Sequence, residues 1–64
     1  MIITHITPLN LLAEYMGDTA TNAEAEAMRD LLCADGREGS DVSEIPEEDW
    51  CRYLCQAVEQ ARAS

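Results

Sequence analysis

Apolar residues recur every three to four positions in three segments of the chain, and this spacing predicts three amphipathic helices. The first expected helix covers residues 9–16, with Thr7 as its N-cap, Pro8 at its first position and Gly17 as a left-handed cap at its end. Its apolar face is wide, which indicates the central helix of a small bundle. That face is formed by Leu9, Leu12, Ala13 and Met16, with Leu11 and Tyr15 beside it.

The second expected helix begins at a capping box, in which the side chains of Thr21 and Glu24 each accept a hydrogen bond from the other residue's backbone amide. This helix runs to about Asp35, and Gly36 ends it. The glycine and serine content of residues 36–45 predicts a loop, which is also acidic.

Pro46 is expected to start the last helix, whose acidic first turn suits the positive end of a helix dipole. In the preceding loop, Asp41 is placed to cap a short helical turn. The core positions expected beyond the first helix are Ala27, Met28, Leu31, Leu32, Val42, Ile45, Trp50, Cys51, Leu54, Ala57, Val58 and Ala61.

The N-terminal segment is rich in β-branched residues, namely Ile2, Ile3 and Ile6. Such residues favour extended backbone, so we expect an apolar arm packed across the bundle, although no partner strand is evident. The sequence therefore predicts a single all-α domain over residues 1–64. Its architecture is a compact bundle of three main helices, with an extended apolar N-terminal arm and an acidic loop before the last helix.

Charge narrows the range of partners. Thirteen acids stand against four arginines, for a net charge of −9. Such a chain repels nucleic acid, and it is disfavoured at anionic membranes for the same reason. The N-terminal segment has no basic start and is too short to span a bilayer, which favours a cytoplasmic location. The odd number of cysteines, three, favours reduced thiols, with Cys51 in the core and Cys33 and Cys55 at its margin.

The sequence contains few motifs typical of catalytic sites, and we expect a protein that is not an enzyme and holds no cofactor. His5 has no neighbouring nucleophile in the sequence, and no glycine-rich phosphate loop is present. The cysteines lack the Cys-x-x-Cys spacing of a zinc knuckle, so no metal site is expected.

The acids are distributed unevenly. Residues 35–49 hold seven acids and a single base, Arg37, whereas residues 1–13 hold no acid. Solubility alone is one explanation. The other is a surface for a basic partner, because carboxylates three or four positions apart on a helix are about 5–6 Å apart, comparable to successive phosphates of a nucleic acid. The predicted contact residues are Glu38, Asp41, Glu44, Glu47, Glu48 and Asp49, flanked by Asp30 and Asp35.

One arrangement of residues resembles a known family. Leu12-Ala13-Glu14-Tyr15-Met16-Gly17 is followed by a thirteen-residue acidic, alanine-rich stretch, by Leu31-Leu32, and by an acidic loop ending in Glu47-Glu48-Asp49-Trp50. This order resembles small phage-encoded anti-CRISPR proteins that inhibit type I CRISPR–Cas systems, and is most similar to those of type I-E. The chain departs from the family in its isoleucine-rich arm, in residues 36–40 and in its Cys51/Cys55 pair.

The resemblance implies a helical protein acting in the cytoplasm of a bacterial host. It would bind a basic surface of a Cas protein in the type I surveillance complex (Cascade), or its nuclease, stoichiometrically and without catalysis. The acidic residues would then cover the channel that target DNA uses. A monomer is the expected state, with a homodimer as an alternative.

Two other functions remain open from the sequence. The protein is an antitoxin or small regulatory subunit if residues 1–6 add a strand to a partner. It is a homo-oligomeric structural protein if the wide apolar face of the first helix is buried between copies. Should the acidic residues not form the interface, the next candidates are the apolar residues expected to be exposed, Leu11, Tyr15 and Tyr53.

Overall fold

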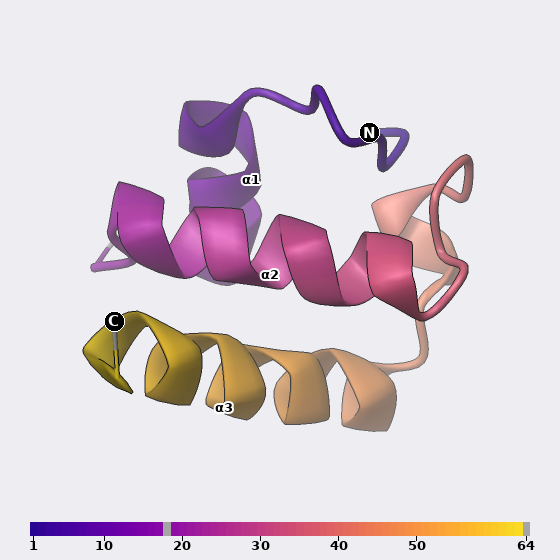
Figure 1. Cartoon of the computed structure of the whole chain (residues 1–64). Coiled ribbons are helices and arrows are strands. Elements are labelled where there is room, and N and C mark those ends of the chain that lie inside the picture. Colours follow the sequence, from indigo (N-terminus) through magenta and orange to yellow (C-terminus); the bar gives the residue numbers. More distant parts are fainter. Residues whose placement is uncertain (18, 64) are drawn as a thin grey trace.

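The computed structural model describes residues 1–17 and 19–63, and these fold into a small helical domain without strands. Its elements are α1 (Leu9–Met16), α2 (Asn22–Ala34), the 3₁₀ helix η1 (Val42–Glu44) and α3 (Glu47–Ala63). The predicted all-α bundle of three main helices is confirmed. The middle position belongs to α2, which packs against both α1 and α3, so the expectation of α1 as the central helix was wrong (Figure 1).

The start of α1 differs from its expected capping. Pro8 is the N-cap, and no side chain caps the helix. The buried Thr7 instead organises the turn before it, because its hydroxyl accepts a hydrogen bond from the Thr4 amide at 2.8 Å and donates to the Ile2 carbonyl at 3.3 Å. Gly17 ends the helix as predicted, but its φ of 132° and ψ of 159° are an extended conformation open to glycine, not a left-handed helical one.

The limits of α2 follow the local signals in the sequence. Both hydrogen bonds of the capping box are present, from the Thr21 amide to Glu24 Oε1 at 2.9 Å and from the Glu24 amide to Thr21 Oγ1 at 3.2 Å. The helix stops at Asp35, its C-cap, and Gly36 follows with a φ of 80°. The buried residues of this helix are Ala25, Ala27, Met28 and Leu32, of which Ala25 was not among the core positions expected from the pattern.

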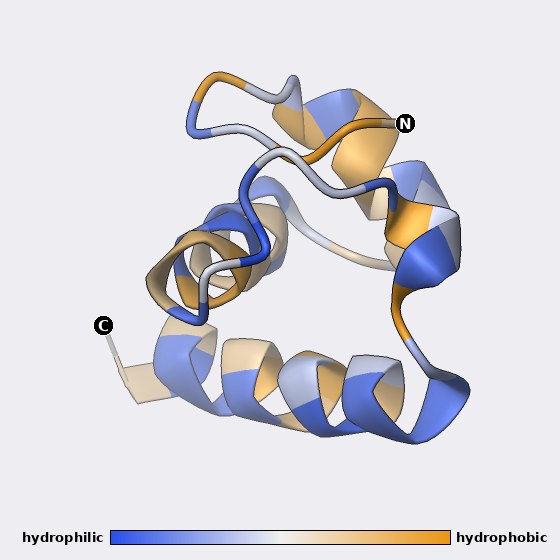
Figure 2. Ribbon diagram, turned by 90° about the vertical axis from the view of Figure 1, so that its right-hand side faces the viewer, coloured by the Kyte–Doolittle hydropathy of each residue, from blue (hydrophilic) through white to orange (hydrophobic). Residues whose placement is uncertain are grey.

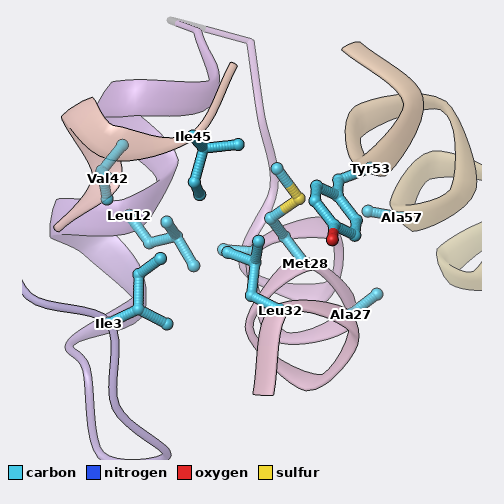
Figure 3. Packing of buried hydrophobic residues seen from close by; sticks show 10 residues of the cluster. Ile3, Leu12, Ala27, Met28, Leu32, Val42, Ile45, Tyr53 and Ala57 are labelled. Atoms are coloured by element: carbon cyan, nitrogen blue, oxygen red, sulfur yellow. The ribbon is translucent and has the colours of Figure 1, made fainter. Parts of the chain in front are cut away.

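The core lies on both sides of α2 (Figure 3). Leu32 faces Leu12 of α1 together with Ile3, Val42 and Ile45, whereas Met28 points toward Tyr53 of α3 (Figure 3). Val42 and Ile45, which are 9% and 8% exposed, anchor the acidic loop to the bundle as predicted.

The buried stripe of α3 is shifted from the expected one. Tyr53 is 2% exposed and Ala57 is fully buried, whereas Cys51 is exposed. The prediction of a core Cys51 was therefore wrong, and so was that of an exposed Tyr53. Tyr53 lies three positions after Trp50 and four before Ala57, which is helical spacing for one face, and Cys51 falls outside that face. The outer side of α3 is hydrophilic (Figure 2).

The N-terminal arm pairs with the acidic loop, for which the sequence offered no sign. The Ile3 amide donates to the Ser40 carbonyl at 2.8 Å, and the Gly39 amide donates to the Ile3 carbonyl at 2.7 Å. An isolated antiparallel bridge joins Ile2 to Asp41. This pairing brings the Ile3 side chain, 1% exposed, into the core, so the arm is part of the fold.

Candidate protein interaction surface

Some of the predicted contact carboxylates are engaged inside the molecule. Glu38 Oε2 lies 2.9 Å from His5 Nδ1 and also accepts a hydrogen bond from the His5 amide at 3.1 Å. Asp41 accepts hydrogen bonds from the Ser43 amide at 3.0 Å and from the Met1 amino group at 3.3 Å. Both carboxylates therefore help to fasten the arm and η1.

These contacts also change the acidity of the two groups. The hydrogen bonds from the His5 side chain and backbone lower the pKa of Glu38 below its ordinary value of 4.5. The backbone and side-chain hydrogen bonds of Ser43 lower the pKa of Asp41 below its ordinary value of 3.8. Both groups are thus held in their charged forms by contacts within the chain.

Asp35 and Asp49 serve the packing of α3. Asp35 Oδ2 accepts a short hydrogen bond of 2.6 Å from the Tyr53 hydroxyl, which satisfies the polar end of a buried ring. Asp49 forms ion pairs with two arginines, Arg37 at 3.2 Å and Arg52 at 3.7 Å. Both aspartates were predicted as contacts with a partner, and the structure places them in contacts within the molecule.

Three predicted contact residues stay free where η1 meets α3. Among the residues that the structure describes, Glu44, Glu47 and Glu48 are exposed and have no ion pair or hydrogen bond through their side chains. We call these three residues the junction carboxylates. Figure 2 shows that α3 begins with a hydrophilic stretch.

The freedom of Glu48 is notable because Arg52 lies four positions later on α3, a spacing that favours an ion pair. The guanidinium instead contacts Asp49 and lies over the Tyr53 ring, with Arg52 Cζ 5.2 Å from the ring centroid. The positive end of α3 stabilises acids in its first turn, which is a local reason for Glu47 and Glu48 that does not depend on any partner.

Asp30 is separate from the junction carboxylates. It lines a surface depression of about 230 Å³ with Glu26 of α2 and Gln60 of α3. Gln60 is thirteen residues beyond Glu47 on the same helix, a separation of about 20 Å at 1.5 Å per residue. The structure therefore divides the predicted patch, and Asp30 lies apart from the junction carboxylates.

A pocket next to the junction carboxylates was not predicted from the sequence. It has a volume of about 250 Å³ and is lined by Tyr15, Val42, Ile45, Glu47 and Trp50, and we call it the aromatic pocket. Tyr15 is 54% exposed and contributes from α1, whereas Trp50 comes from α3. The only sequence signal was an aromatic residue at the edge of the apolar face of the first helix.

The cysteines do not form a site in the described part of the chain. Cys51 and Cys55 are exposed free thiols. Cys33 is half-buried, and burial raises the pKa of its thiol. Within residues 1–17 and 19–63, no three His, Cys, Asp or Glu side chains come together in a way that could hold a metal ion.

Comparisons with protein families, with curated proteins and with solved structures found no match to this chain. In the described residues, no helix combines the length and apolar character needed to cross a membrane.

Proposed function

We propose that the protein binds a basic protein surface stoichiometrically and inhibits it, with Glu44, Glu47 and Glu48 as the main contacts. The resemblance of the sequence to type I anti-CRISPR proteins gives the proposal its specific form. The target is then a Cas protein of the type I surveillance complex, and the acidic surface occupies the channel needed by target DNA. No bond is made or broken in this function, so the protein is not an enzyme.

The observation that carries this proposal is that the junction carboxylates have no ion pair within residues 1–17 and 19–63, although the chain contains four arginines. Arg37 and Arg52 both contact Asp49, and Arg29 donates to the Thr7 carbonyl at 3.1 Å. Unpaired acids on a chain with a net charge of −9 repel one another, and a cationic partner reduces that repulsion. The junction is therefore the part of the acidic segment that gains most from a basic neighbour.

Solubility and helix capping explain the same acids without a partner, so the test needs a control of equal charge. The triple variant E44Q/E47Q/E48Q removes the junction carboxylates. The control variant E14Q/E26Q/E59Q removes three other exposed carboxylates. It therefore has the same net charge as E44Q/E47Q/E48Q. Circular dichroism checks that both variants keep the helices, since glutamine weakens the favourable dipole interaction at the start of α3.

Binding is measured with a purified type I-E surveillance complex, directly and in competition with its target DNA duplex. The wild-type protein is expected to displace the duplex at about one copy per site. An exposed ion pair contributes about 0.5–1 kcal/mol, so loss of three should weaken binding about 10- to 100-fold. The control triple should stay within about threefold, and affinity should fall with salt. Equal binding by the two triple variants would show that the position of the lost charges does not affect binding, and would contradict the proposal.

The arm supports a second candidate, an antitoxin or small regulatory subunit. Ile2 and Ile6 are 52% and 75% exposed, so their side chains are open to a partner. However, the Ile3 amide and carbonyl already bond to the loop, which leaves less of the arm's backbone for strand addition. Deleting residues 1–6 would remove Ile3 from the core, so a point substitution at Ile6 is the cleaner probe.

A further inference from the structure

The aromatic pocket combines three chemical features in one place. Val42 and Ile45 give it an apolar wall, Tyr15 and Trp50 add two aromatic rings, and Glu47 supplies an exposed carboxylate. Its volume of about 250 Å³ is below the roughly 300–1,000 Å³ of typical small-molecule sites. A single side chain of a partner is therefore a better match in size than a cofactor.

We propose that this pocket receives an arginine side chain of the basic partner. The inference rests on the proposed function and deepens it by naming the residue type that the partner inserts. An arginine has an apolar stem, which would lie against Val42 and Ile45. Its planar guanidinium stacks on aromatic rings and pairs with carboxylates, which Tyr15, Trp50 and Glu47 provide.

The charge around the pocket selects against other occupants. An apolar side chain would leave Glu47 without a counter-charge, whereas a cationic side chain supplies one. A second copy of this chain carries a net charge of −9 itself and would be repelled. Lysine neutralises Glu47 as a point charge, but it lacks the flat group that stacks on an aromatic ring. Within the chain, Arg52 already lies over the Tyr53 ring at 5.2 Å, outside the pocket.

Trp50 gives a direct signal for the test because it is the single tryptophan of the chain. Nona-arginine and nona-lysine peptides are titrated at low salt into the full-length protein, labelled with ¹⁵N. Binding is followed by calorimetry, by Trp50 fluorescence and by the Trp50 indole N–H resonance. We expect nona-arginine to shift both Trp50 signals and to bind at least threefold more tightly than nona-lysine.

Variants then distinguish binding in the pocket from general electrostatic attraction between the acidic protein and the basic peptide. Y15A and E47Q should each weaken nona-arginine binding about three- to tenfold. E14Q removes an equal charge next to Tyr15 but outside the pocket lining, and it should stay within twofold. Since Tyr15 is 54% exposed, Y15A is expected to keep the fold, which circular dichroism verifies.

The outcomes distinguish this inference from the function on which it rests. If both peptides bind without moving the Trp50 signals, or move them equally, the pocket is not an arginine site and the proposed function stands. If neither the peptides nor the surveillance complex binds, the proposed function itself is wrong.

Discussion

The contact between Tyr53 and Asp35 tests whether a predicted binding residue in fact stabilises the fold. The Tyr53 ring is 2% exposed, and its hydroxyl donates to Asp35 Oδ2 at 2.6 Å. A hydrogen bond to a charged acceptor contributes about 1.5–3 kcal/mol when buried. Asp35 is exposed and water competes for it, so we expect about 1 kcal/mol.

Y53F removes the hydroxyl but keeps the ring against Met28. A loss of about 1 kcal/mol should lower the melting temperature by about 4–8 °C in a domain of this size. D35A should cost less, because it also removes a negative charge from the C-terminal end of α2, where the helix dipole disfavours one. Each single variant therefore mixes several effects.

A double-mutant cycle isolates the contact. Thermal unfolding of the wild type, Y53F, D35A and Y53F/D35A is followed by circular dichroism. Y53F should cost about 1 kcal/mol with Asp35 present and less without it, because the Tyr53 hydroxyl then keeps only its contact with Arg37. D35A should also bind the surveillance complex within about threefold of the wild type. The reasoning is refuted if the Y53F penalty is the same in both backgrounds, or if D35A loses binding while keeping its stability.

Two further predictions concern the arm. The pKa of Glu38 is lowered in the folded chain, so its contact with His5 stabilises the fold above pH 4.5 and is lost as pH falls through the lowered value. Urea unfolding should accordingly find the wild type more stable than E38Q at pH 6, and the difference should close toward pH 3; a constant difference would contradict this. I6S should leave the melting temperature within about 2 °C because Ile6 is 75% exposed. Tenfold weaker binding of the surveillance complex by I6S would favour the arm as the interface.

Local signals in the sequence were enough to predict where the main helices lie. The Thr21–Glu24 capping box and the glycines after α1 and α2 mark where these helices begin or end, because each acts on backbone groups only a few residues away. The buried face of α3 was harder to predict. Cys51 and Tyr53 are two positions apart and lie on opposite sides of the apolar stripe of α3, and the packing against Met28 shows which of the two sides is buried.

The division of the acidic segment could not be predicted because it depends on contacts between distant residues. His5 is 33 positions from Glu38, and Tyr53 is 18 positions from Asp35. The pairing of the arm with the loop is equally non-local, since Ile3 meets Ser40. A sequence pattern shows where carboxylates are concentrated, but the fold decides which of them keep a free charge.

That division affects how the proposed surface would bind a partner. Glu38 and Asp41 would have to exchange contacts within the chain for contacts with a partner, so much of the energy gained would be lost again. In the described part of the chain the junction carboxylates have no such contact to give up, because Asp49 pairs with the two arginines nearest to them in sequence. A cation that approaches Glu44, Glu47 and Glu48 therefore breaks no ion pair, and the one between Arg37 and Asp49 stays in place. The fold thus concentrates usable negative charge at one end of α3, next to the aromatic pocket.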